Sequence, residues 1–195
     1  NWSDVRPEWP NEPIQRFSPG TDSGTFDYFV EAIMGPAFQN AEGKADPKAG
    51  EAAILESAGT QFSEDDNVLV QGVQGSPYAI GYFGYAYYAA HKDKMTAVAI
   101  DNGKGKGAVA PSLENVTNGS YNPLSRPLFV YVKESSAARP EVREFVQFMM
   151  TQGSALVTEV GYVPLPDAAY KLAWQHFTNK KLGSVFGGVP KVGIT

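Results

Sequence analysis

The chain has 195 residues, of which 43% are hydrophobic and 19% charged, and its formal net charge is -5. This composition is typical of a folded protein and excludes disorder as the default state. An acidic chain without a basic block also argues against nucleic-acid binding, because neutralising phosphates requires clustered Lys and Arg.

Cysteine is absent, and the only histidines are His91 and His176. Disulfide frameworks, thiolate metal sites and cysteine nucleophiles are therefore excluded. A zinc site or a Ser-His-Asp triad would need one histidine beside the right partners. We expect His91 at the surface, His176 packed or exposed on a helix, and neither a metal nor a cofactor. A chain without cysteine also suits an oxidising compartment such as a bacterial periplasm.

The first 50 residues predict one short strand and one helix. Residues 1–13 contain three Pro and show no signal peptide, so we expect an extended leading segment of a mature sequence or a fragment. A strand-like run over 14–17 ends before Pro19-Gly20. Apolar side chains between 26 and 33 recur at helical spacing, which predicts a helix that Gly35-Pro36 stops. Residues 37–50 are expected to form a surface loop.

The middle of the chain is rich in aromatic residues. Asp65 or Asp66 is suited to cap a helix, although two glycines weaken this prediction. The run PYAIGYFGYAYY over 77–88 is expected to be buried. Residues 95–100 predict a strand, and 102–107 predict a loop rich in turns.

The last third predicts several helices and one strand. Ser112 opens a short helix, and LFVYV over 128–132 is an apolar strand. Pro140 suits the first turn of a helix that Gly153 ends. Further helices are predicted over 154–160 and 167–178, and the tail is irregular. No apolar run approaches the roughly 18 residues of a membrane span. Strands alternating with helices favour the α/β class.

The segment SPGTDSGT over 18–25 is the sharpest chemical feature of the chain. A strand runs into a loop of Gly and small hydroxyl residues, and a helix begins at once. The first backbone N–H groups of a helix lack internal partners and lie at the positive end of its dipole. Gly24 allows close approach of an anion, and Ser23 and Thr25 add hydroxyl donors. This loop is either an anion cradle or a plain N-cap.

Asp22 permits two interpretations. A carboxylate repels an anion unless it accepts a proton, and a protonated phosphate carries such a proton whereas sulfate has none. Asp22 would then select phosphate over sulfate. Alternatively, Asp22 points away and caps the helix.

Ser23 could instead be the nucleophile of a phosphate-ester hydrolase. A Ser nucleophile needs a base, and no His, Lys or paired carboxylate lies near it in sequence. The chain also lacks the Gly-x-x-x-x-Gly-Lys loop of nucleotide hydrolases. We therefore expect a binding protein and no enzyme.

The segment SPGTDSGTFDYFVEAI resembles the periplasmic phosphate-binding proteins of ABC-type uptake systems, and within them the branch found in cyanobacteria and related bacteria. The resemblance continues through PYAIGYFGYAYY, YNPLSRPLFVYV and GSVFGGVPKVGIT. It implies a type II periplasmic-binding-protein-like α/β fold, in which a mixed sheet is flanked by helices and two lobes close on the anion.

The resemblance also implies a division of the chain. Residues 1–11 would be a leading and hinge segment, and 12–122 would form the second lobe. Residues 123–195 would cross the hinge and complete the first lobe, whose opening half is not in this sequence.

The family's Ser-Gly-Thr matches Ser23, Gly24 and Thr25 directly. The common family pattern places an Arg four positions before that Ser, where this chain has Pro19. Arg126, at the second hinge crossing, is the preferred replacement, and Arg16 is the alternative. An Arg fork suits phosphate oxygens because it binds them bidentately.

The function that the resemblance implies is high-affinity binding of inorganic phosphate for an ABC-type permease, in the periplasm or on a lipid anchor at the cell surface. Another oxyanion, such as sulfate, molybdate or a phosphonate, is the alternative ligand. Apolar surface that would face the absent half makes self-association of the chain possible.

Overall fold

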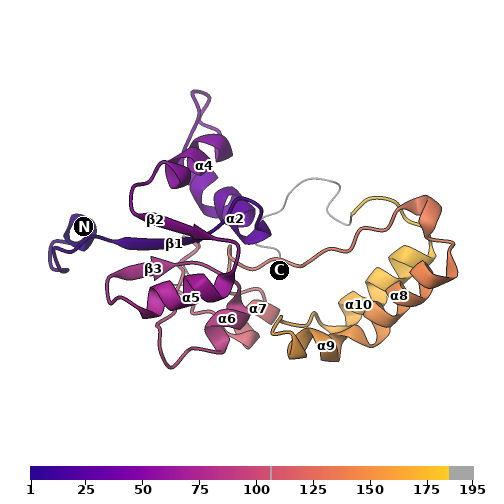
Figure 1. Ribbon diagram of the computed structural model, residues 1–195. Coiled ribbons are helices and arrows are strands. Elements are labelled where there is room, and N and C mark those ends of the chain that lie inside the picture. The colour runs from indigo at the N-terminus through magenta and orange to yellow at the C-terminus, as the bar shows by residue number, and fades with distance from the viewer. Residues whose placement is uncertain (106, 185–195) are drawn as a thin grey trace. The chain divides into compact units, whose positions relative to one another are not determined.

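The computed structural model describes residues 1–105 and 107–184 of the chain (Figure 1). The chain forms two compact units that divide after Val98. The lobe boundaries predicted at residues 11 and 122 stay a prediction. Among the described residues, no helix has the length and apolarity that crossing a membrane would need.

The first unit is built on a three-stranded parallel sheet. The strands β1 (Gln15–Pro19), β2 (Thr60–Ser63) and β3 (Ala79–Gly81) have the order β2-β1-β3. Arg16 pairs with Thr60 on one side and with Ile80 on the other. The described strands are thus all parallel, where the sequence predicted a mixed sheet.

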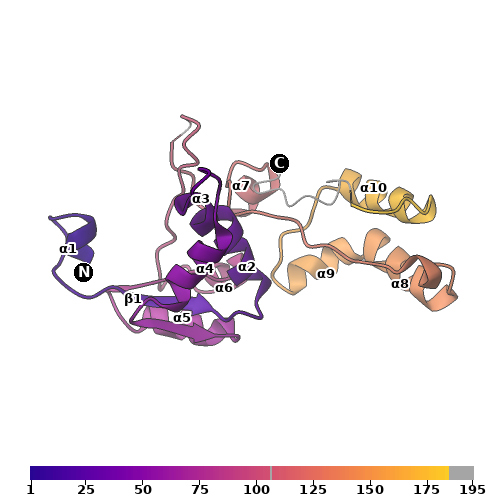
Figure 2. The same cartoon turned by 90° about the horizontal axis from the view of Figure 1, so that it is seen from above.

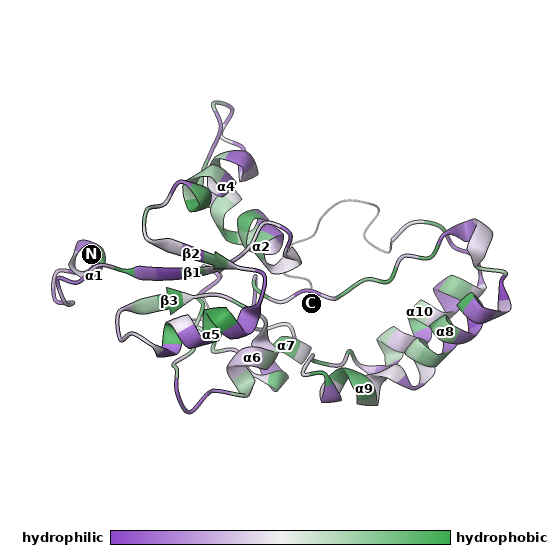
Figure 3. Cartoon of the chain, viewed as in Figure 1, coloured by the Kyte–Doolittle hydropathy of each residue, from purple (hydrophilic) through white to green (hydrophobic). Residues whose placement is uncertain are grey.

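Helices cover both faces of this sheet (Figure 1). The side chain of Phe17 faces the helix α5 (Asp66–Gln74), where Gly72 leaves room for its ring. Ser18 points to the opposite face, because successive strand residues alternate. There Tyr82 stacks on Phe29 of α2 (Gly24–Phe29), with ring centroids 4.1 Å apart. Figure 3 shows both hydrophobic and hydrophilic stretches along α5.

A continuous helical run supplies the main core of this unit. It comprises α2, a π-helical turn η1 (Val30–Met34) and α3 (Gly35–Ala37). Phe26 and Val30 of the run pack against Ile54 of α4 (Pro47–Leu55), and all three side chains are buried. Figure 2 shows α4 beside α2 and α3. Two short helices complete the unit, α1 (Trp2–Val5) and α6 (Tyr85–Ala89).

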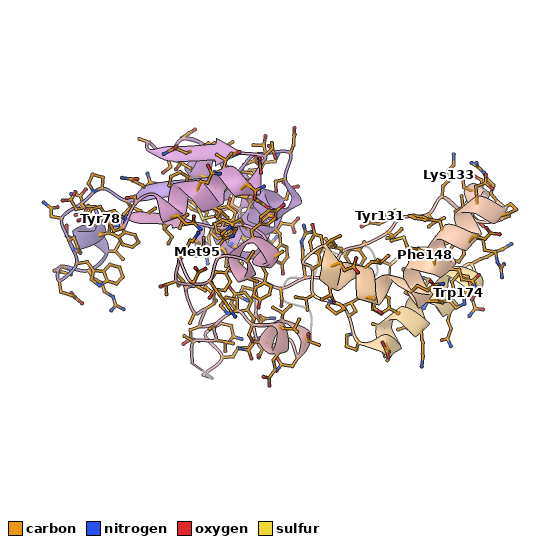
Figure 4. The ribbon with its side chains drawn as sticks, turned by 60° about the horizontal axis from the view of Figure 1, so that its bottom comes forward. Tyr78, Met95, Tyr131, Lys133, Phe148 and Trp174 are labelled. Carbon is orange, nitrogen blue, oxygen red and sulfur yellow. The ribbon has the colours of Figure 1, made fainter. Side chains whose placement is uncertain are left out.

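The N-terminal segment is tied to the sheet by one side chain. The indole Nε1 of Trp2 donates a hydrogen bond to the carbonyl oxygen of Tyr78, 3.0 Å away. Figure 4 shows Tyr78 beside α1.

Two predictions for the first 50 residues are wrong. Gly35-Pro36 does not stop the helix, because the helical run continues through α3, which contains Pro36 and directly follows the π-helical turn η1. The expected loop 37–50 contains the start of α4. Asp46 caps this helix by accepting a hydrogen bond from Ala49 N at 3.0 Å, and Pro47 follows at the first helical position.

The other helix predictions of the first unit have mixed outcomes. Asp65 caps α5, as expected, by accepting a hydrogen bond from Asn67 N at 2.9 Å. The aromatic run 77–88 is mostly half-buried and not buried, since it lies at one edge of the small sheet. Residues 95–100 form no described strand, and only Ile100 pairs with Val109 in an isolated bridge.

The described part of the second unit consists of helices and extended segments. The helices are α7 (Leu113–Thr117), the 3-10 turn η2 (Glu134–Ser136), α8 (Pro140–Thr151), α9 (Gly153–Glu159) and α10 (Asp167–Thr178). These helices confirm the predictions from Ser112 onward, except that Gly153 begins α9. The tail beyond Ser184 lies outside the described residues.

The predicted strand 128–132 has no counterpart among the described strands. Four of the five side chains of this segment are exposed, and Val132 is half-buried. Tyr131, labelled in Figure 4, is 87% exposed. A strand requires a neighbour for its backbone groups, and no described strand pairs with this segment.

We predict that Gly72→Ala destabilises the first unit by about 1–3 kcal/mol, because added core atoms force neighbouring side chains out of position. A Cβ at residue 72 would overlap the buried ring of Phe17. Urea denaturation measures the change. The control is Gly84→Ala, whose Cβ would make ordinary contacts with Tyr87. Equal stability of the two variants would contradict the packing of Phe17 on α5.

Candidate anion-binding loop

The carboxyl ends of the three parallel strands meet at one edge of the sheet. A short connection leads from each end into a helix: from β1 to α2, from β2 to α5 and from β3 to α6. This edge is where open α/β sheets bind ligands. The connection that leaves the central strand begins at residue 20 and leads to the predicted site residues Asp22, Ser23, Gly24 and Thr25.

Ser23 is the N-cap of α2. Its Oγ accepts a hydrogen bond from Thr25 N at 3.2 Å, and its own N–H donates to the carbonyl oxygen of Gly20 at 3.1 Å. The plain cap is therefore present, and Ser23 rather than Asp22 provides it. Since the hydroxyl oxygen is used as an acceptor, its single proton remains directed away from the cap. Capping and anion binding are thus compatible in this loop.

The structure brings four of the predicted site residues together. Asp22, Ser23, Gly24 and Thr25 form the turn and first helical positions. Asp22 and Gly24 are exposed, while Ser23 and Thr25 are half-buried. An anion can therefore approach the backbone at Gly24, where no side chain intervenes.

A hydrogen-bonded chain supports this loop from beneath. Ser18, which is 2% exposed, donates from Oγ to the carbonyl oxygen of Pro19 at 2.9 Å. Its Oγ also lies 2.7 Å from the hydroxyl of Tyr82. Because a serine hydroxyl has one proton, Tyr82 must be the donor of the second bond. Burial raises the pKa of Tyr82, against the opposing effect of the Ser18 bond, so the phenol stays protonated and able to donate.

Pro19 occupies the place of the family arginine and is fully buried. It ends the central strand, where a proline would normally leave a ladder position unpaired. Phe17 accepts a hydrogen bond from Tyr82 N at 3.3 Å, and Gly20 N donates to Ser63. Pro19 therefore faces the β3 side, beyond the paired residues of β3, so its missing N–H removes no bond from the ladder.

The two candidate arginines lie in different surroundings. Arg16 is at the amino end of β1, where its guanidinium donates to Thr60 Oγ1 at 3.1 Å and to the carbonyl oxygen of Ala58. It is therefore engaged at the end of the strand opposite to Ser23. Arg126 is an exposed residue of the second unit and follows the buried Ser125, whose Oγ donates to Tyr121. Contact between Arg126 and the loop stays a prediction.

The edge of the sheet carries acidic side chains that the sequence analysis did not place there. Glu64 Oε1 accepts a hydrogen bond from Asp22 N at 3.2 Å. Burial raises the pKa of Asp66, a hydrogen bond from the backbone of Gly84 lowers it, and the charge of Asp65 raises it. These acids form no potential metal site within the described chain. The signal for them was the run SEDD directly after β2.

Neither histidine serves Ser23 as a base in the described contacts. Nδ1 of His91, which is half-buried, lies 2.9 Å from the carbonyl oxygen of Tyr87 on the preceding turn. His176 is half-buried on α10 in the second unit. The Oγ of Ser23 contacts the backbone of Thr25. Within the described part of the chain, no contact pairs Ser23 with the base that a nucleophile needs.

Comparisons with known proteins show what this chain is similar to. The chain is 46% identical over 195 residues to Protein SphX of Synechocystis sp., covering 100% of this chain and 53% of that protein. It is 40% identical over 171 residues to Phosphate-binding protein PstS of Staphylococcus haemolyticus, covering 87% and 48%. The chain thus spans about half the length of the curated relatives it matches. The PstS name describes a binding protein and not an enzyme.

Two solved structures confirm the predicted type II fold class. A possible phosphate binding protein from Planctomyces limnophilus has a TM-score of 0.67 and 39% identity, over 93% of this chain and 58% of that one. A putative phosphate ABC transporter substrate-binding protein with bound phosphate from Clostridium perfringens has a TM-score of 0.52 and 23% identity, over 85% and 57%, and supports the fold alone.

A family model described as the PBP superfamily domain matches residues 1–152. With the parallel sheet and these structural likenesses, this match shows that the chain belongs to the PBP superfamily.

Proposed function

We propose that the chain carries part of the site with which a solute-binding protein captures inorganic phosphate for an ABC-type permease. The observation that carries this proposal is the capped start of α2 at the carboxyl edge of the sheet. There, the hydroxyl groups of Ser23 and Thr25 lie beside the exposed Gly24 at the positive end of the helix. The relatives named as phosphate-binding proteins support the same ligand.

The acidic edge favours a protonated anion. Asp22 is exposed beside the cap, and the carboxylate of Glu64 accepts its N–H. A monohydrogen or dihydrogen phosphate can give a proton to a carboxylate, whereas a fully ionised sulfate meets only repulsion. Asp22 is therefore the proposed proton acceptor and the residue that discriminates phosphate from sulfate. Molybdate and phosphonates are the remaining alternatives.

Tight capture requires donors from two lobes. This chain supplies the loop on α2 and, in the proposal, Arg126 from the segment that crosses the hinge. The permease would then recognise the closed form. Such a protein works outside the cytoplasmic membrane, either free in a periplasm or attached to the cell surface through a lipid anchor.

We predict that phosphate shifts the backbone amide signals of Ser23, Gly24 and Thr25 in an NMR titration of this chain. The affinity of a partial site is expected to be on the order of millimolar, about -4 kcal/mol. Sulfate is the parallel control and should shift the same amides less. In the Asp22→Asn variant, the amide shifts caused by phosphate and by sulfate should become more similar. Shifts spread over the whole surface, or none at these amides, would contradict the proposed loop.

We predict that Arg126→Ala weakens phosphate binding in the complete, two-lobe protein by about 1.5–3 kcal/mol, as expected for the loss of a charged hydrogen-bond partner. The matched control is Arg16→Ala, because Arg16 is engaged with Thr60 and Ala58 at the other end of β1. The control should lower stability and leave the affinity unchanged. If Arg16→Ala lowers the phosphate affinity and Arg126→Ala does not, the anion contact belongs to Arg16.

We also propose that the chain self-associates through the apolar surface of its second unit. Exposed side chains there include Tyr131, Phe145 and Val160, at 87%, 62% and 66%. Sedimentation should show dimers at high concentration, and a Tyr131→Ser, Phe145→Ser double variant should shift the chain toward monomer. The control is Val5→Ser, which changes an apolar residue of the first unit that is 59% exposed. A clean monomer at all concentrations would refute self-association.

A further inference from the structure

The turn that precedes Ser23 wraps around one carboxylate. Glu64, in the connection between β2 and α5, extends its side chain over Gly20, and its Oε1 accepts the hydrogen bond from Asp22 N at 3.2 Å. Its neighbour Ser63 accepts a hydrogen bond from Gly20 N at 3.1 Å through its carbonyl oxygen. Two successive residues of one connection therefore hold two positions of the anion-binding loop.

Gly20 is required for this contact because of space and not because of backbone conformation. A Cβ at residue 20 would overlap Oε1 of Glu64 and lie 2.5 Å from its Cδ. The φ of Gly20 lies outside the left-handed region that favours glycine, so alanine can adopt the same backbone. The glycine and the carboxylate therefore form one complementary pair.

We propose that Glu64 is a positioning residue of the anion-binding loop, holding Asp22 N–H so that the start of α2 faces the anion in a fixed orientation. This inference rests on the proposed function. The carboxylate of Glu64 accepts the N–H of Asp22, which is therefore not available to the anion. The anion must bind to donors that follow Asp22 in the chain. Because Ser23 N donates to the carbonyl oxygen of Gly20, the held turn also fixes the position of Ser23.

The role of Glu64 as an acceptor is separable from its charge. Glu64→Gln keeps an oxygen that can accept the Asp22 N–H and removes the negative charge. If the oxygen positions the loop, this variant retains phosphate affinity, whereas Glu64→Ala does not. Glu56→Ala removes another exposed carboxylate of the same unit and controls for the change in net charge.

The test is a double-variant cycle with Gly20→Ala and Glu64→Ala, followed by NMR in the intact chain. Without ligand, each single variant should shift the Asp22 amide signal, because each removes its acceptor. With phosphate as the probe, each should weaken binding about fivefold, the effect expected when one ordinary hydrogen bond is lost. In the Glu64→Ala background, Gly20→Ala should have no further effect on either readout.

Additive effects of the two substitutions would overturn the proposal, as would an unchanged Asp22 amide and affinity in Glu64→Ala. Loss of affinity in Glu64→Gln equal to that in Glu64→Ala would also overturn it, because charge alone would then be responsible. The Asp22 amide is read without ligand. If the two substitutions shift the Asp22 amide non-additively but phosphate shifts no amide of the loop, the contact between Glu64 and Asp22 is confirmed. The same result refutes the proposed function.

Discussion

Parallel pairing of β1 between β2 and β3 is the constraint on which the rest of the site depends. Because all three strands run in one direction, their carboxyl ends and the helices that follow them meet at the same edge. Asp22 is brought to Glu64, and Ser18 to Tyr82, in this way, although the partners are far apart in sequence. The burial of Phe17 against α5 fixes the register, since a slip by one residue would turn Ser18 toward α5.

An acidic chain can bind an anion because local donors outweigh distant charges. Exposed carboxylates act through water and salt, where two unit charges 4 Å apart interact by only about 1 kcal/mol. A hydrogen bond to a charged group contributes roughly 1.5–3 kcal/mol, and a cap with several donors offers more than one. In the proposed site, the acids at the sheet edge would therefore select among anions without preventing their binding. Discrimination and affinity would come from different atoms of the same loop.

The sequence predicted those features that depend on neighbouring residues. The helix starts at Asp65, Ser112 and Pro140 follow local capping and proline rules, and all three agree with the structure. The predicted strand at 128–132 pairs with none of the described strands, and pairing depends on a partner that local pattern does not reveal. Glu64 was missed for the same reason: its contact with Asp22 spans 42 positions. The Asp46-Pro47 pair is a further local signal, and it marks the start of α4.

The two units bury their apolar residues very differently. Eight apolar side chains of the first unit are buried, whereas Val146 is the one buried apolar residue in the described part of the second. Helices α8 and α10 pack on each other and leave Phe145 and Leu172 exposed. A surface of this kind needs a further partner to be stable in water.

If each lobe of a complete protein contributed about -4 kcal/mol, their sum would correspond to roughly micromolar affinity before the cost of closure. A loop that binds weakly alone is therefore suited to a protein that closes only when both lobes contact the anion.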